Sequence, residues 1–183
     1  MTEYTINSSG AVVPAKGGAQ PILITMTADE FRENKAEFTF HREMLHSLGS
    51  IRYCKAELYK GCVIGTMRIP RKEAQRAPEL CFGFCLTDKT LHIIEDTGEY
   101  KALVARLVNH SSGAARPSQL LLRLLELLTE NDVPYMMHIE TELERMEDEL
   151  GQKPGDDFFR RLTRHRQKLS ELGAYYGQLS DIG

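Results

Sequence analysis

Residues 51–70 read IRYCKAELYKGCVIGTMRIP, and residues 80–95 read LCFGFCLTDKTLHIIE. Each stretch contains two runs rich in β-branched and aromatic residues, with a short polar link between them: Lys60-Gly61 in the first and Thr87-Asp88-Lys89 in the second. The pattern predicts two consecutive β-hairpins. Because four strands follow one another without an intervening helix, we expect an antiparallel or mixed sheet and not one wound through βαβ units.

The segment that precedes the hairpins adds one strand and one helix. Residues 22–26 (ILITM) form an apolar run with the length of a buried strand. Thr27 follows, with Glu30 three residues further on, which is the capping-box pattern that opens a helix. Residues 1–20 are small and polar with scattered glycines, and this composition predicts a flexible lead-in or an edge strand.

Beyond Gly98 the apolar residues recur at helical spacing. They predict one helix over residues 100–110 and a long one over residues 118–150, kinked at Pro134 because proline removes a backbone hydrogen bond. Residues 151–155 (GQKPG) end that helix, and a last helix follows them.

These elements predict an α+β fold, in which a mixed, largely antiparallel sheet is flanked by helices and followed by a long antiparallel helical hairpin. We divide the chain into a flexible N-terminal lead-in (1–20), an α/β sheet domain (21–115) and a charged helical hairpin (116–183). A chain of 183 residues buries roughly two-thirds of its unfolded surface, so we expect it to fold without any cofactor, metal or disulfide.

The two helices of the hairpin carry apolar seams and opposite charges. The seam of the first helix consists of Ile139, Leu143, Met146 and Leu150, and that of the second of Leu162, Leu169, Leu172, Tyr176 and Leu179. The first helix is acidic, with Glu140, Glu142, Glu144, Glu147, Asp148 and Glu149. The second is basic in its first half, with Arg160, Arg161, Arg164, Arg166 and Lys168. Matching seams and complementary charge predict an antiparallel pair.

The acidic helix has two interpretations. Its carboxylates pair with the basic helix and solvate the surface, or they attract hydrated divalent cations, which prefer oxygen ligands. The candidates for such a metal site are Glu140, Glu144, Glu147 and Asp148. The basic helix could instead bind phosphate, but the neighbouring helix supplies enough acid to neutralise it.

The composition is that of an ordinary globular protein, with 42% hydrophobic and 27% charged residues. The formal net charge is −3, without the basic excess of a nucleic-acid binder, so we expect no nucleic acid as partner. The most apolar run, residues 120–128, is shorter than the roughly 18–20 residues of a membrane helix and contains two charges. We therefore expect a soluble intracellular chain.

The residues with metal-binding or catalytic chemistry form no known motif. The four cysteines lack a close CxxC pair, and we interpret them as buried reduced thiols. The histidines of residues 41–46 (HREMLH) are five apart, one more than a helix needs to aim both at one metal. His92 lies in a predicted strand, where we expect it at the surface or facing a partner. No GxSxG, P-loop or GxGxxG motif occurs, so we assign no catalytic residue and expect no enzyme.

Three stretches carry a resemblance to a known family. They are residues 51–70, residues 80–100 and residues 117–150, the last of which reads PSQLLLRLLELLTENDVPYMMHIETELERMEDEL. Their order resembles the cytoplasmic part of the CorA-like magnesium transporter family, over roughly residues 20–183. The resemblance implies an α/β/α sandwich at the cytoplasmic face of the cell membrane, within a homo-oligomer that is pentameric in the family. It also implies a domain that senses intracellular divalent cations, magnesium foremost, and loosens when they leave.

Several family features are absent from the sequence. It contains neither the Gly-Met-Asn pore signature nor two membrane helices, so the chain cannot transport ions alone and would meet the membrane only through a missing C-terminal region. Its apolar seam runs on to Ile182, which indicates a cut through a longer helix. Pro134 interrupts the place where the family usually carries an Asp-Tyr pair, so no metal ligand is transferred. Some relatives move zinc, cobalt or nickel, and the ion stays open.

A second hypothesis comes from a different class of protein. It describes a free-standing cytosolic interaction protein whose helical hairpin docks on a partner. This hypothesis predicts an exposed apolar strip along Leu172, Tyr176 and Leu179. Packing of the same strip against the protein's own sheet would count against it.

Overall fold

A computed structural model describes residues 1–34, 38, 41–59, 61–72, 79–96, 100–111, 113, 116–151 and 155–182. Its strands are β1 (Thr2–Ile6), β2 (Val12–Pro14), β3 (Leu23–Met26), β4 (Lys55–Tyr59), β5 (Cys62–Ile69), β6 (Leu80–Thr87) and β7 (Leu91–Ile94). Its helices are α1 (Ala28–Glu33), α2 (His41–Leu48), α3 (Tyr100–His110), α4 (Pro117–Thr129), α5 (Asp132–Leu150) and α6 (Phe158–Ile182). Lys60, Gly98, residues 152–154 and Gly183, which entered the predictions above, lie outside the described residues.

The strands form one seven-stranded sheet in the order β2-β1-β3-β7-β6-β5-β4. The two predicted hairpins are present as β4–β5 and β6–β7, and both are antiparallel. The pair β3–β7 is parallel, with Leu23 opposite Leu91, and it joins the N-terminal strands to the hairpins. Residues 1–20, expected as a lead-in or an edge strand, contribute β1 and β2 at one edge of the sheet. The predicted mixed, largely antiparallel sheet is confirmed.

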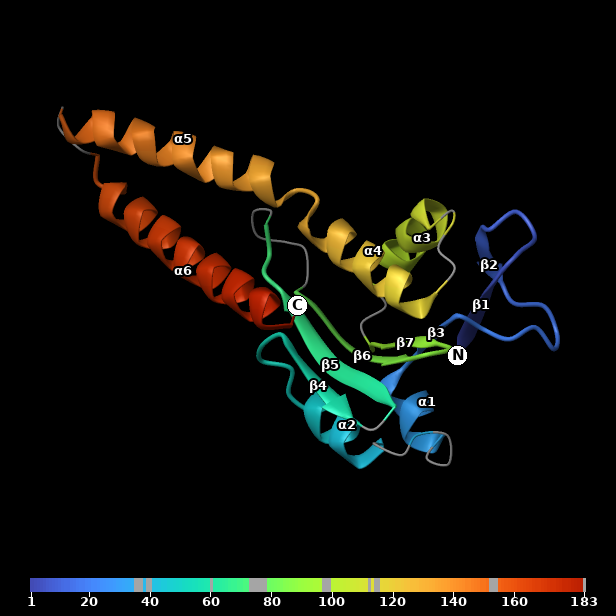
Figure 1. Cartoon of the computed structure of the whole chain (residues 1–183). Coiled ribbons are helices and arrows are strands. Elements are labelled where there is room, and N and C mark those ends of the chain that lie inside the picture. The colour runs from blue at the N-terminus through green and yellow to red at the C-terminus, as the bar shows by residue number, and fades with distance from the viewer. Residues whose placement is uncertain are drawn as a thin grey trace.

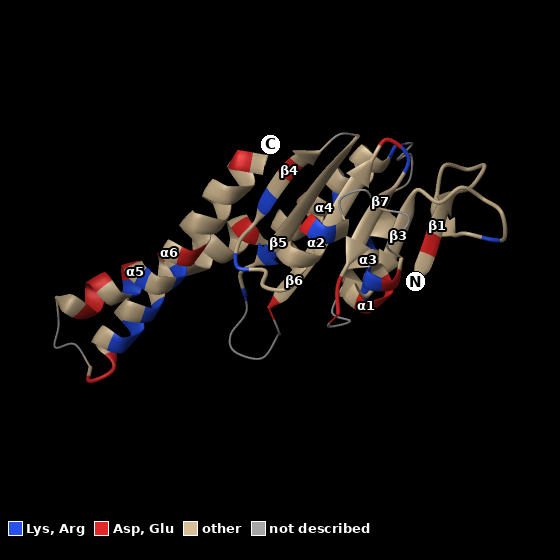
Figure 2. Cartoon of the chain, turned by 90° about the horizontal axis from the view of Figure 1, so that it is seen from below, with Lys and Arg blue, Asp and Glu red and all other residues tan. Residues whose placement is uncertain are grey.

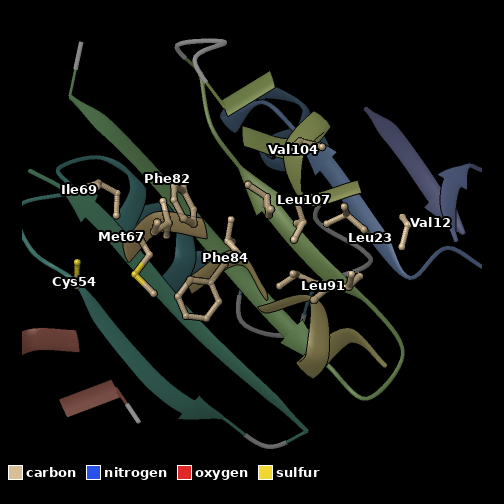
Figure 3. Close-up of a cluster of buried hydrophobic side chains, with 14 of the residues drawn as sticks. Val12, Leu23, Cys54, Met67, Ile69, Phe82, Phe84, Leu91, Val104 and Leu107 are labelled. Carbon is tan, nitrogen blue, oxygen red and sulfur yellow. The ribbon is translucent and has the colours of Figure 1, made fainter. Parts of the chain in front are cut away.

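Helices cover both faces of this sheet (Figure 1). On one face, α3 packs against the sheet through Val104 and Leu107 (Figure 3), and α4 packs there through Leu120 and Leu124. On the other, α1 and α2 contribute Phe31 and Met44 to a second apolar cluster. Neighbouring side chains of a strand point to opposite faces of the sheet, so β6 contributes side chains to both apolar clusters. The architecture is therefore an α/β/α sandwich.

Two local sequence signals explain parts of this sandwich. The Thr27 hydroxyl accepts a hydrogen bond from the Glu30 backbone N–H at 3.1 Å, and the Glu30 carboxylate accepts one from the Thr27 N–H at 2.9 Å. The predicted capping box thus opens α1. Gly65, in the centre of β5, leaves room for its neighbours, because a Cβ atom there would overlap the Lys55 carbonyl oxygen and the ring of the fully buried Phe84.

The long helix predicted over residues 118–150 is wrong in one respect. The helix is interrupted between α4 and α5 at Glu130 and Asn131, where Asn131 has φ −98° and ψ 11°. Pro134 then lies in the first turn of α5, where the N–H that proline lacks would have no partner within the helix. The proline therefore marks the start of a new helix and does not kink an existing one.

The predicted seam of the returning helix is also partly wrong. Leu172 is buried, but Leu162 and Leu169 are 39% and 38% exposed. The C-terminal half of α6 packs on the sheet domain through Leu172 and Tyr175, and this contact fixes the rotation of the helix. With the helix in this rotation, the residues that precede Leu172 and Tyr175 at helical spacing face α5. Leu162 and Leu169 are not among them and point away. That inward set is Phe158, Arg161, His165 and Lys168.

Candidate functional site

A groove of about 900 Å³ lies between α5 and α6. The two helices meet at the tip of the hairpin and separate towards the sandwich (Figure 1). From α5 the wall of the groove receives Tyr135, His138, Ile139 and Glu142, which are spaced along one face of the helix. Arg71 and Lys72, which follow β5, complete the described wall at the base. We call this space the hairpin groove.

The hairpin groove is basic. Its described lining includes six lysine or arginine side chains and three aspartate or glutamate side chains. The basic ones are Arg71, Lys72, Arg160, Arg161, Arg164 and Lys168. Figure 2 shows the basic residues gathered along the outer half of α6. The groove therefore attracts anions more strongly than cations.

Ion pairs neutralise half of these basic groups. Arg161 donates three hydrogen bonds from Nη1 and Nη2 to the Glu149 carboxylate at 3.0 to 3.1 Å, and these bonds raise the pKa of the guanidinium. Lys168 pairs with Glu171 at 2.9 Å. Lys72 pairs with Asp132. Within the described part of the chain, Arg71, Arg160 and Arg164 have no carboxylate within ion-pair distance.

The base of the hairpin contains a buried carboxylate. Asp132, the first residue of α5, is only 5% exposed. The Lys72 ammonium pairs with it and also donates a hydrogen bond to the Leu128 carbonyl oxygen at 2.5 Å. Burial, followed by the nearby Asp132 carboxylate, raises the pKa of the Tyr176 hydroxyl. These contacts connect the segment after β5, the end of α4, the start of α5 and the second half of α6.

The four candidate metal ligands lie on the outer side of the hairpin. Glu140, Glu144, Glu147 and Asp148 are exposed, and none of them lines the hairpin groove. Among the residues that the structure describes, no three His, Cys, Asp or Glu side chains are placed to hold a metal ion. Their role as metal ligands therefore stays a prediction.

Charge pairing between the two helices is weaker than the sequence indicates. In the described part of the hairpin, Arg161 with Glu149 is the ion pair that joins α5 to α6. Glu142 pairs instead with Arg145 on its own helix. Apart from the buried Asp132, the other acidic side chains of α5 face solvent, so they do not neutralise the basic side of α6.

The cysteines and histidines lie mostly in the sandwich. Cys54, Cys62 and Cys85 are buried as predicted, whereas Cys81 is partly exposed and departs from the prediction. Burial raises the pKa of the Cys85 thiol. The surface position expected for His92 is wrong. Its ring is 8% exposed and meets the ring of Phe38 edge-on, with the ring centroids 5.0 Å apart. Burial lowers the pKa of His92 to about 4, so the imidazole is neutral at neutral pH.

Sequence reasoning missed two residues of the hairpin groove. Arg71 and Lys72 belong to the charged connection between the β-hairpins β4–β5 and β6–β7. Nothing in the local sequence indicates that they approach α6, which follows much later in the chain. The inward face of α6 does have a signal. The positions of the large apolar residues Leu172 and Tyr175, extended backwards at 3.6 residues per turn, would have selected Arg161, His165 and Lys168.

The fold defines the class of protein, an α/β/α sandwich with a projecting, charged helical hairpin. Among the described residues, no helix is both long and apolar enough to span a membrane. Comparison with known families then gives the family. The family model described as "CorA-like Mg2+ transporter protein" matches residues 26–183, and the chain belongs to this family. The resemblance seen in the sequence is confirmed.

Solved structures agree with this fold. The full-length CmaX protein has a TM-score of 0.73 and 14% identity, and the match covers 99% of this chain and 61% of CmaX. The ZntB cytoplasmic domain from Vibrio parahaemolyticus RIMD 2210633 has a TM-score of 0.65 and 12% identity, covering 96% of this chain and 73% of that domain. A comparison with curated proteins gave no match. The chain thus spans about three-fifths of the length of CmaX, and at these identities the likeness shows the fold alone.

Proposed function

We propose that this chain is the cytosolic regulatory domain of a CorA-like transporter of divalent cations, with magnesium as its ion, and that it lacks the pore. The observation that carries the proposal is the family match, which extends over residues 26–183. The extent of the structural match supports it, because 99% of this chain aligns with 61% of full-length CmaX. In this proposal the pore belongs to a further region at the cytoplasmic face of the cell membrane.

The proposed regulation follows from the acidic side of α5. The exposed carboxylates of Glu140, Glu144, Glu147 and Asp148 form one face of the helix, away from the hairpin groove. In a homo-oligomer, carboxylates that approach a neighbouring copy repel it until a divalent cation neutralises them. Loss of the cation would loosen the assembly, and by linkage a looser assembly would bind the cation less tightly. The domain would thereby report the cation concentration to a pore.

The first test is the reading frame of the source gene beyond Gly183, followed by transport measurements on its full product. We expect two apolar helices joined by a Gly-Met-Asn loop, and uptake of Mg²⁺ into liposomes that contain the full protein. Uptake of Zn²⁺, Co²⁺ or Ni²⁺ in preference to Mg²⁺ would correct the ion. A stop codon directly after Gly183 would contradict the proposal as a whole.

A second test concerns the cation-dependent assembly. We expect Mg²⁺ to increase self-association of the chain in sedimentation velocity runs, and the combined change Glu140→Gln, Glu144→Gln, Glu147→Gln and Asp148→Asn to abolish that increase. Glu33→Gln on α1 also removes an exposed carboxylate and is the control. An unchanged Mg²⁺ response in the fourfold variant would remove the acidic face of α5 from the proposal.

The structure counts against the free-standing interaction protein. That hypothesis needs an exposed apolar strip along Leu172, Tyr176 and Leu179. Leu172 is instead buried, and Tyr176 and Leu179 pack against the main apolar cluster of the sandwich. The strip therefore holds α6 on its own domain and is not free to dock on a partner.

A further inference from the structure

We propose that the hairpin groove binds an anion that carries several phosphate groups. The sequence places an acidic helix beside a basic one, and this neighbourhood predicts neutralisation. The geometry does not provide it, because the acidic side of α5 faces outward and the basic side of α6 faces the groove. The inference goes beyond the proposed function and holds whether or not the chain belongs to a working transporter.

The first support is a set of three guanidinium groups without acidic partners among the described residues. Arg160 and Arg164 are four residues apart, so they lie on the same face of α6. Arg71 reaches the same groove from the end of β5. Three like charges around one space repel one another, and an anion between them removes the repulsion.

The second support is that the nearby carboxylates other than Asp157 already form ion pairs. Glu171 pairs with Lys168, and Glu142 pairs with Arg145. At the tip and the base, Glu149 pairs with Arg161 and Asp132 with Lys72. These pairs use one acid for each base, and Asp157, the third acidic residue of the lining, can offset at most one of the three remaining arginines. The groove thus carries a net positive charge in the described part of the chain.

The chemistry of the lining selects phosphate. A guanidinium presents a planar set of N–H donors that matches two oxygens of one phosphate, and arginines in groups are a common way to bind phosphorylated ligands. A volume of about 900 Å³ is near the upper end for small-molecule sites and exceeds the size of a single phosphate. The groove therefore fits a chain of phosphates or a phosphorylated headgroup, and the rings of Tyr135, His138 and His165 are available for the rest of the ligand.

The test is a calorimetric titration of the chain with sodium tripolyphosphate at physiological salt. We expect saturable binding that weakens as the salt concentration rises. The double variant Arg160→Gln/Arg164→Gln should weaken it roughly tenfold or more, since each arginine contributes a charge-assisted hydrogen bond. Arg166→Gln is the matched control, because Arg166 is also an exposed arginine of α6 but does not line the groove. It should change the affinity less than about twofold.

Vesicle flotation separates the two sources of such a ligand. Binding to vesicles that contain phosphatidylinositol 4,5-bisphosphate but not to tripolyphosphate, with loss in Arg160→Gln/Arg164→Gln, would support the site and assign it to a lipid headgroup with several phosphates. Binding to tripolyphosphate assigns it to a free polyphosphate. Absence of saturable binding to both probes, or an equal loss in Arg166→Gln, would overturn the proposal. Thermal unfolding of each variant confirms that the comparison is made on folded protein, and no divalent cation is needed in any of these measurements.

Discussion

The imidazole of His92 is a buried base in the layer between the sheet and helices α1 and α2. Burial lowers its pKa from 6.5 to about 4. Between these two pH values the unfolded chain binds a proton at this position and the folded chain does not. The free energy of unfolding therefore falls as the pH falls through this window.

This residue gives a prediction for the pH dependence of stability. Lowering the pH from 7 to about 4 should cost about 3 kcal/mol of unfolding free energy through His92, and His92→Gln should remove most of that loss. Urea unfolding at a series of pH values measures it. His46→Gln, which replaces an exposed histidine, is the control. If the variant and the parent chain lose stability in parallel, the pH dependence has another origin.

At the scale of elements, the same substitution should act in opposite directions on a strand and on a helix. Gly65→Ala in β5 pushes a methyl group into the Lys55 carbonyl and the Phe84 ring, and we expect a loss of about 1–3 kcal/mol. Gly173→Ala in α6 meets no atom within 4 Å and should stabilise the chain by up to about 1 kcal/mol. Denaturant midpoints of both variants test this. A stable Gly65→Ala would show that β5 and Phe84 can move apart.

Elements that are specified by their own residues could be predicted from the sequence, whereas features that depend on distant contacts could not. Strand β5 (Cys62–Ile69) lies in the second of the two runs predicted within residues 51–70, because a hairpin is specified by its own residues and its turn. The parallel pairing of β3 with β7 has no local signal, since residues 27–90 separate the two strands in the sequence. Likewise, the phase of α6 is set by its docking at Leu172, so the seam drawn through Leu162 and Leu169 was wrong.

The candidate site likewise combines features that the sequence shows with features that only the tertiary packing determines. The basic side of α6 is visible in the sequence as a run of arginines, and the acidic side of α5 as a run of glutamates. Their relative orientation is a tertiary property. Arg71 reaches the hairpin groove from a connection that the sequence presents only as charged.

At the scale of the whole molecule, the ion pair between Lys72 and Asp132 joins the segment after β5 to the start of α5. Lys72→Met would leave the Asp132 carboxylate buried without its partner, and we expect a loss of about 3 kcal/mol. Lys72→Met/Asp132→Asn removes both charges and should recover most of that loss. Chemical unfolding of the two variants decides between these outcomes. Equal stability of Lys72→Met and the parent chain would mean that water reaches Asp132.

The position of β3 between β1 and β7 also determines the order in which the strands can pair while the protein is synthesised on the ribosome. Leu23 and its neighbours leave the ribosome early, but their parallel partner, which begins at Leu91, is synthesised much later. Until then the apolar run ILITM has no strand on that side and remains open to chaperones or to other nascent chains. The pairing of β3 with β7 should therefore be the last part of the sheet to form.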